Sequence, residues 1–368
     1  MKVAVCQVSL HVGEPDQNLA AAAAAIAEAA SLGARVIVLP ELTRSGYAFG
    51  DEAEARSLAE SADGPTATQW AGLAVRHQVV IVGGFAEIGG DGLLYNSAML
   101  VDRRGVRAIY RKAHLWDAEA DFFTPGSAPP PVVDTEHGRI AMMVCYDAEF
   151  PEWVRRPALA GAELLAVPTN WPAEPIPAGE RPMVTANIGV AAFANRIFIA
   201  AACRCGDERG ISWTGGSIIA GPDGYPLAGP ASTSRLPRSG APAGMEAGGP
   251  AARPELLIAD CDLRLARSKA TGPRNDAHTD RRVDLYGADA DLYGADAGGQ
   301  SLRASVRPSP IGSSTSSTRV SARAWPLNRL MPCTVSPWRC RSTTRPWESV
   351  LSTRMMPPGL IIGTISSQ

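Results

Sequence analysis

The sequence predicts a layered α/β sandwich built from mixed β-sheets. Helical segments alternate with short apolar runs of strand type along the first 287 residues or so. Several of these runs are apolar throughout, which is typical of strands buried inside a layered fold. Closely spaced strand pairs around turn residues interrupt the alternation and indicate hairpins. These three observations favour mixed sheets over a purely doubly wound parallel sheet.

The elements follow one another with recognisable boundaries. The first helix contains a long alanine run and ends near Gly33, a residue type common after helix ends. Another helix opens with Pro151-Glu152, because proline suits the first helical turn. A turn at Pro222-Asp-Gly224 indicates a hairpin. Strands are predicted at 2–9, 35–39, 78–87, 94–102, 105–111, 139–145, 163–168, 197–203, 213–220, 225–229 and 255–262, and helices at 16–32, 66–77, 151–160 and 180–195.

Composition indicates a globular protein. The chain has 368 residues, a hydrophobic content of 45% and a net charge of −2, which gives no general attraction to nucleic acid or membrane. Seven cysteines without framework spacing suggest free thiols in a reducing compartment. The N-terminus does not have the pattern of a signal peptide, and no apolar run reaches the roughly 18 residues of a membrane span. We therefore expect a cytoplasmic protein.

The character of the sequence changes after residue 287. A seven-residue segment starting at Asp284 is repeated at once from Asp291. From Gly298 to Gln368 there are nine arginines, one acidic residue and no lysine, among many Ser, Thr and Pro. We predict a folded domain at 1–287 and a disordered tail, low in complexity and rich in Arg, Ser, Thr and Pro, at 288–368. A frame slip in a GC-rich gene would leave such a tail; the alternative is a basic tail that binds an acidic partner.

The segment around Cys145 is the strongest candidate for chemistry. An apolar run, Ile-Ala-Met-Met-Val, leads to Cys145, and a polar turn then leads to the next helix. Backbone N–H groups converge at such a turn and favour a thiolate, so the place suits a nucleophile. The alternative is a buried cysteine that packs as a small hydrophobic side chain.

Two further residues occupy equivalent positions after strands. Glu41 follows Val-Ile-Val-Leu, and Lys112, one of only three lysines, follows Arg107-Ala-Ile-Tyr-Arg. Ligands in α/β folds bind outside the carboxyl ends of strands, so these groups and Cys145 are expected to meet at one edge. Glu41 would act as general base. Lys112 would favour the thiolate and stabilise an oxyanion, with the backbone N–H of Tyr146 as a second donor.

These motifs resemble the nitrilase, or carbon–nitrogen hydrolase, superfamily. Its Glu–Lys–Cys triad is matched by Leu39-Pro-Glu41, Tyr110-Arg-Lys112 and Val144-Cys145-Tyr-Asp. A second glutamate of the family, which would help position Lys112 and the substrate, is matched by Glu119 ahead of Phe123-Thr-Pro-Gly. Further matches are Phe150-Pro-Glu152, Pro168-Thr-Asn-Trp171, Ala192-x-x-Asn195-Arg196 and Asp280-Arg-Arg-x-Asp-Leu-Tyr286, so that the resemblance runs in family order to about residue 287.

The resemblance implies a four-layer α-β-β-α sandwich, assembly into a homodimer or larger homo-oligomer, and no metal or organic cofactor. It also implies hydrolysis through a cysteine acyl-enzyme, with release of ammonia or an amine. The Cys-Tyr-Asp-x-Glu pattern is similar to amidases of the family, so a small amide is the expected substrate. A nitrile and an N-carbamoyl amine stay open as alternatives, as does a non-catalytic binding protein.

Four residues near these motifs are candidates for substrate binding. Trp116, Tyr146 and Trp171 would wall an acyl pocket, and Asn170 precedes one of them. The alternative for the aromatic residues is ordinary core packing. Neither Cys203-Arg-Cys205 nor the five histidines have the spacing of a metal site, so no metal is expected.

Overall fold

The computed structural model describes residues 1–177, 179–234, 236 and 251–286. The predicted tail, 288–368, lies outside the described residues, so its character and the boundary at 287 stay predictions. Within the described part no helix is long and apolar enough to cross a membrane.

The first of two six-stranded sheets holds the N-terminal strands. Its order is β14-β1-β2-β3-β4-β5. The neighbours β1, β2 and β3 run parallel, whereas β14, β4 and β5 each pair antiparallel to a neighbour. The bounds are β1 Lys2–Gln7, β2 Ala34–Val38, β3 Val80–Ile88, β4 Leu94–Asp102, β5 Gly105–Arg111 and β14 Glu255–Asp260.

The second sheet repeats this plan. Its order is β13-β12-β9-β8-β7-β6, with β7, β8 and β9 parallel and the outer strands antiparallel. The bounds are β6 Val132–Thr135, β7 Gly138–Met142, β8 Leu164–Thr169, β9 Phe198–Cys203, β12 Ile218–Ala220 and β13 Pro226–Ala228. The predicted mixed sheets are therefore confirmed.

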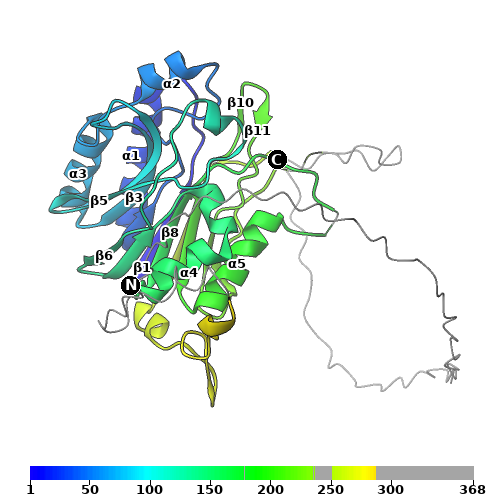
Figure 1. Cartoon of the computed structure of the whole chain (residues 1–368). Coiled ribbons are helices and arrows are strands. Elements are labelled where there is room, and N and C mark those ends of the chain that lie inside the picture. The colour runs from blue at the N-terminus through cyan, green and yellow to red at the C-terminus, as the bar shows by residue number, and fades with distance from the viewer. Residues whose placement is uncertain (178, 235, 237–250, 287–368) are drawn as a thin grey trace, which may run out of the picture. The chain divides into compact units, whose positions relative to one another are not determined.

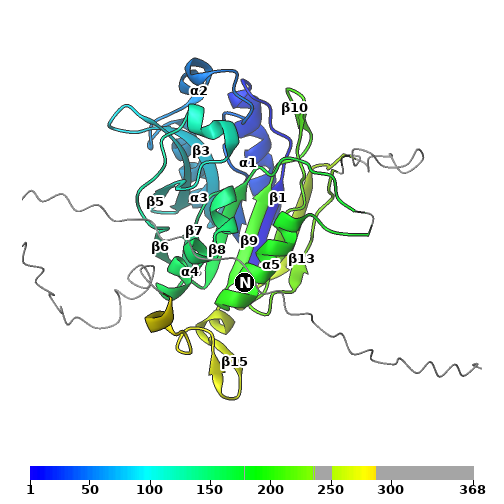
Figure 2. The same cartoon turned by 45° about the vertical axis from the view of Figure 1, so that its right-hand side comes forward.

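Four layers result from the way helices cover these sheets. Helices α1 (Pro15–Ser31) and α3 (Pro65–His77) cover the first sheet, and α4 (Pro151–Leu159) and α5 (Met183–Asn195) cover the second (Figure 1). Strands β1 and β9 lie next to each other in the middle, between α1 and α5 (Figure 2). The observed arrangement is the predicted α-β-β-α sandwich.

The alternation of side chains along a strand explains why these strands are apolar on both faces. In β1, Val3 and Val5 join the core between the two sheets, while Ala4 and Cys6 join the core beneath the helices. All four side chains are buried. Burial on both faces removes the polar alternation that an exposed sheet would show.

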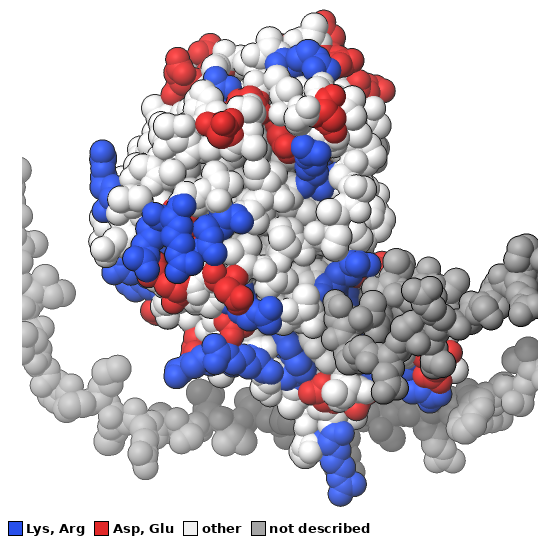
Figure 3. All heavy atoms as spheres, turned by 60° about the vertical axis from the view of Figure 1, so that its left-hand side comes forward, with Lys and Arg blue, Asp and Glu red and all other residues white. Residues whose placement is uncertain are grey.

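Smaller elements complete the described part of the chain. Helix α2 spans Glu52–Leu58. Two short ribbons are formed by β10 Asp207–Glu208 with β11 Ile211–Ser212, and by β15 Ala270–Gly272 with β16 Asn275–Asp276. Four short 3₁₀ turns are η1 Asp117–Asp121, η2 Cys145–Glu149, η3 Leu263–Arg267 and η4 Val283–Leu285. In Figure 3, acidic side chains gather at the end that carries α2, and basic ones gather further down the same face.

Several predicted boundaries need correction. The strand predicted at 139–145 ends at Met142, because the chain turns into η2 at Cys145. The helix predicted from 180 begins at Met183, after a proline-containing loop, and the strand predicted at 213–220 shortens to β12. Helix α2 and strand β6 were not predicted. These are short elements at the edges, where local pattern is weakest.

Candidate active site

Cys145 occupies an unusual backbone position between a strand and a helix. It is the first residue of η2, and its φ of 46° lies in the left-handed region. A residue with a β-carbon adopts this region at a cost of about 1–3 kcal/mol, and surrounding contacts must maintain it. The turn holds the thiol at the end of the second sheet, directly before α4.

The buried carboxylate of Asp147 provides those contacts. It accepts hydrogen bonds from the backbone N–H of Val144 at 3.3 Å and of His114 at 3.0 Å. The hydroxyl of Tyr110 donates to the same carboxylate at 2.7 Å, and Nδ1 of His114 lies 2.7 Å from it. Asp147 therefore connects the Cys145 turn to the segment that follows β5.

Glu41, Lys112 and Glu119 form a buried charge cluster. Nζ of Lys112 lies 2.8 Å from Oε1 of Glu41 and 2.7 Å from Oε1 of Glu119. Both Lys112 and Glu41 are fully buried, and Glu119 is 4% exposed. The backbone of Glu41 lies close to β3, since a β-carbon on Gly84 would come within 2.6 Å of the Glu41 Cα. The structure thus brings Glu41 and Lys112, predicted from separate strand ends, together with Glu119, which the family resemblance indicated.

One cation between two carboxylates leaves this cluster with an excess negative charge. Burial raises the pKa of Glu41 to about 7, where Lys112 opposes the shift and Glu119 adds to it. Burial alone would lower the pKa of Lys112, but the charges of Glu41 and Glu119 outweigh it and raise that pKa. Glu41 therefore titrates near neutrality beside a permanent cation, as a general base should.

The thiol of Cys145 lies in the same electrostatic environment. Burial raises the pKa of Cys145 well above its ordinary value; the charge of Glu41 raises it further, and Lys112 opposes both effects. The hydroxyl of Thr169 donates a hydrogen bond to Sγ at 3.2 Å. The sequence predicted that the turn favours a thiolate, and this is wrong for the resting protein, because burial outweighs the turn. The nucleophile needs a base to take its proton.

Three residues at the site were missed by the sequence reasoning. Asn96 in β4 donates to Oε1 of Glu41 at 2.7 Å, Tyr47 donates to Oε1 of Glu119 at 2.5 Å, and Thr169 contacts the thiol. Thr169 ends β8, next to the strand of Cys145, so the strand-end argument would have found it. Asn96 interrupts an apolar strand, which is a weaker signal. Tyr47 lies in a loop, and no sequence pattern indicates its role.

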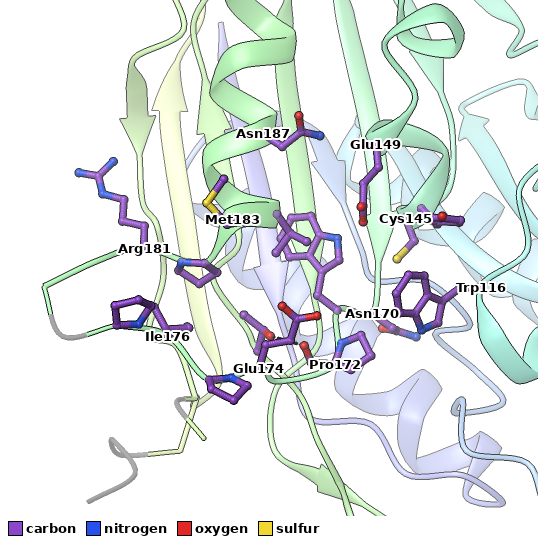
Figure 4. Close-up of a pocket in the computed structure, with 17 residues that line it drawn as sticks. Trp116, Cys145, Glu149, Asn170, Pro172, Glu174, Ile176, Arg181, Met183 and Asn187 are labelled. Atoms are coloured by element: carbon purple, nitrogen blue, oxygen red, sulfur yellow. Dashed lines mark hydrogen bonds between the residues drawn. The ribbon is translucent and has the colours of Figure 1, made fainter. Parts of the chain in front are cut away.

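A cavity of about 360 Å³ opens beside Cys145 (Figure 4). All four predicted substrate-binding residues line it: Trp116, Tyr146, Asn170 and Trp171. The rings of Trp116 and Tyr146 pack edge to face at 4.9 Å. The structure thus places these residues on the wall of the cavity beside the Cys145 thiol, and their role in binding stays a prediction.

Asn170 also joins the two sheets. Its side-chain amide donates to the backbone carbonyl of Glu41 at 2.9 Å, and its side chain is buried. The first sheet supplies Glu41, and the second supplies Cys145 and Asn170. This hydrogen bond therefore fixes the base and the nucleophile relative to each other.

Taken together, the arrangement suits acyl transfer. A buried thiol, a carboxylate that titrates near neutrality and a fixed ammonium group lie beside a cavity that admits a small molecule. Among the described residues, no group of three or more His, Cys, Asp or Glu is placed to hold a metal ion.

Comparison with known proteins gives the same result. A family model described as carbon–nitrogen hydrolase matches residues 2–269. The chain is 35% identical over 287 residues to a nitrilase of Pyrococcus abyssi (strain GE5 / Orsay), covering 78% of this chain and 99% of that protein. It is 33% identical over 228 residues to an (R)-stereoselective amidase of a Pseudomonas sp., covering 62% of this chain and 80% of the amidase.

Solved structures agree. The chain is similar to an amidase from Nesterenkonia sp., with a TM-score of 0.59 and 28% identity over 77% of this chain and 94% of that one. A mutant of the Nesterenkonia sp. AN1 amidase, which carries acrylamide added at its active-site cysteine, matches with the same TM-score and covers 98% of that chain. With its four-layer fold, its buried Glu–Lys–Cys triad and this match over most of its length, the chain belongs to the carbon–nitrogen hydrolase family of the nitrilase superfamily.

Proposed function

We propose that this protein is an amidase that hydrolyses the C–N bond of a small amide through an acyl-enzyme on Cys145. The observation that carries the proposal is the state of Glu41. Its Oε2 is buried without a hydrogen-bond partner among the described residues, and its pKa is about 7. A carboxylate in this condition can accept the thiol proton and return it later.

Acylation begins when Glu41 takes the proton of Cys145 as the sulfur attacks the amide carbon. The carbonyl π electrons move to oxygen, and Lys112 with the backbone N–H of Tyr146 stabilises that oxyanion. As the tetrahedral intermediate collapses, the C–N bond breaks, and the leaving nitrogen takes the proton from Glu41. Ammonia or an amine departs, and a thioester stays on Cys145.

Deacylation uses the same groups in reverse. Glu41 takes a proton from water, whose oxygen attacks the thioester carbon. The C–S bond then breaks, the sulfur recovers its proton from Glu41, and the carboxylic acid leaves. Glu119, whose carboxylate lies 2.7 Å from Nζ of Lys112, supports this cycle by holding the ammonium group in place.

The preference for an amide over a nitrile substrate follows from the segment after the nucleophile and from the relatives. Tyr146-Asp147 follows Cys145, and amidases are among the proteins that the chain resembles. A nitrilase is the second candidate, because the relative matched over 99% of its length carries that name. An N-carbamoyl amine is the third candidate substrate.

Ammonia release from three panels of compounds tests the choice. Small amides should be hydrolysed, while nitriles and N-carbamoyl amines of the same acyl size should react more slowly. Turnover of nitriles without turnover of amides would show that the protein is a nitrilase. The Cys145→Ala variant should lose all hydrolysis; if it kept full activity, the nucleophile would be assigned wrongly. If no compound of the three panels reacted, the non-catalytic alternative would gain support.

We also propose that the protein forms a homodimer or a larger homo-oligomer. Three large apolar side chains of α5 are strongly exposed: Met183 at 77%, Val190 at 64% and Phe193 at 52%. An apolar face of this kind is typical of an interface between protein chains. Light scattering of the purified protein measures the molar mass of the assembly. A Val190→Glu substitution should reduce this molar mass.

A further inference from the structure

Two carboxylates on the wall of the cavity have no role in the mechanism above. Glu149 ends the turn that begins with Cys145, and Glu174 lies in the loop after β8. Within the described residues neither carboxylate makes a hydrogen bond or an ion pair, and both residues are accessible to solvent while Glu149 is partly enclosed by the cavity wall. Figure 4 shows both carboxylates at the cavity, with that of Glu149 on the side of the Cys145 sulfur and that of Glu174 on the side of the loop after β8.

Other acidic residues near the site already form ion pairs with basic side chains. Glu41 and Glu119 bind Lys112, and Glu208 binds the buried Arg204. Arg181, the one basic residue among the described residues that line the cavity, directs its guanidinium away from the middle in Figure 4. Among the described residues, no cation therefore neutralises the negative charge of Glu149 and Glu174 at short range.

The charge of Glu174 acts on the carboxylate of Glu149. Partial burial raises the pKa of Glu149, the charge of Glu174 raises it further, and Lys112 opposes the shift. Mutual repulsion of this kind is relieved when a cation lies between the two groups. A cavity with these two carboxylates on its wall is thus electrostatically suited to a positive ligand.

The remaining wall points to the same kind of ligand by an independent route. The side chains of Trp116, Tyr146 and Trp171 line the cavity, and aromatic faces attract cations. Asn170 is 1% exposed, yet its Oδ1 accepts no hydrogen bond from the described residues. A ligand that carries hydrogen-bond donors would satisfy this acceptor.

We propose that the acyl group transferred to Cys145 carries an ammonium group, which Glu149 and Glu174 bind while the aromatic side chains enclose the carbon chain. The preferred substrates are then amino-substituted amides. This inference rests on the proposed amidase function and narrows it to a class of substrate. Neutral amides of the same shape are poorer substrates, and amides with a carboxylate at the far end are the poorest.

Isosteric pairs of amides test the charge preference on the full-length protein at pH 7.5. The pairs are 3-aminopropanamide with butanamide, and 5-aminopentanamide with hexanamide; adipic acid monoamide supplies the anionic case. We expect kcat/KM for the ammonium member of at least one pair to exceed that of its neutral partner by about tenfold or more. The anionic amide should be slowest.

Charge-neutralising variants assign the preference to the two carboxylates. Glu149→Gln and Glu174→Gln should each lower the ratio of ammonium to neutral kcat/KM by about threefold or more. Glu152→Gln is the matched control, because Glu152 is exposed on α4 and does not line the cavity. It should leave the ratio unchanged.

The outcomes separate this inference from the amidase function. Hydrolysis of neutral amides with a ratio near one for both pairs would overturn the charge preference and leave the amidase function standing. An unchanged ratio in both variants would also overturn it. If no amide reacts, the amidase function fails, and calorimetric binding of the same pairs to Cys145→Ala still decides whether the cavity prefers the cation.

Discussion

The hydroxyl of Thr169 donates a hydrogen bond to Sγ of Cys145 across 3.2 Å. Thr169 ends β8, and Cys145 lies three residues beyond the end of the neighbouring parallel strand β7, so the contact forms where these two strands leave the second sheet. Because Cys145 is buried with a raised pKa, this donor gains strength as negative charge develops on sulfur. Thr169 is therefore expected to assist the attack step.

Substitution of Thr169 tests this contact. Thr169→Val keeps the shape but removes the donor, and it should lower the acylation rate by about ten- to a hundredfold, as for a hydrogen bond to a charged group. Thr169→Ser retains the hydroxyl and should stay within severalfold of the wild-type rate. Single-turnover kinetics with an amide measures the step. Equal rates for the valine and serine variants would contradict the role.

The activity should depend on pH through the charge cluster. Protonated Glu41 cannot accept the thiol proton, so kcat/KM should fall as the pH decreases through about 7, the pKa of Glu41. Because the charge of Glu119 raises that pKa, Glu119→Gln should move the acid limb to lower pH. Glu60→Gln, a change at a buried carboxylate bound to Thr66, is the control and should not move it.

The free energy of unfolding should depend on pH because Glu41 is a buried carboxylate. Folding raises the pKa of Glu41 from 4.5 to about 7, so above pH 4.5 the unfolded chain releases a proton that the folded chain retains. This destabilises the fold progressively up to about pH 7. Glu41→Gln should therefore raise the free energy of unfolding by about 1–3 kcal/mol at pH 8, with no gain at pH 4.5. Denaturant titrations at both pH values measure the difference. Cys145→Ala, inactive but still charged at Glu41, should lack this pH-dependent gain.

Tyr47 is expected to position Glu119. Its hydroxyl donates to Oε1 of Glu119, the oxygen that also binds Lys112. Tyr47→Phe should lower kcat by about five- to tenfold, as for the loss of a single hydrogen bond, with little change in KM. Tyr95→Phe removes a similar hydroxyl–carboxylate bond, to Asp91, away from the site. If both variants have the same kcat, Tyr47 has no positioning role.

We predict that the chain after Tyr286 is dispensable for catalysis. All the charged groups of the mechanism lie within the described domain, and the last of its strands in the two large sheets ends at Asp260. A protein truncated after Tyr286 should keep the kcat/KM of the full chain or be more soluble. Loss of folding, measured by circular dichroism, would show instead that the tail contributes to the structure.

The sequence predicted the fold well where burial dictates the pattern. Strand β2, for example, is apolar from Val36 to Val38 because helices cover one face and the second sheet covers the other. The end of β7 was predicted three residues too late, since Met143, Val144 and Cys145 are as buried as the strand itself. Hydrophobicity reports burial, and it does not distinguish a strand from the turn that ends it.

The triad was predictable because its members end separate strands that point to one edge. The supporting contacts were not, since they depend on distances between segments far apart in the chain. Tyr47 and Glu119 are an example: no periodicity relates them, and only the fold brings them to 2.5 Å. The excess negative charge that raises the pKa of Glu41 follows from the same unpredicted proximity.

The catalytic groups come from different sheets, and this makes the reaction sensitive to the packing between them. Glu41 and Lys112 follow strands of one sheet and Cys145 follows a strand of the other, with the bond from Asn170 to Glu41 between them. A small slip of one sheet over the other would separate base from nucleophile while leaving every strand intact. The rate of turnover therefore reports on the packing of the core between the sheets. Val→Ala changes in this core should abolish activity at a smaller loss of packing than is needed to unfold the protein.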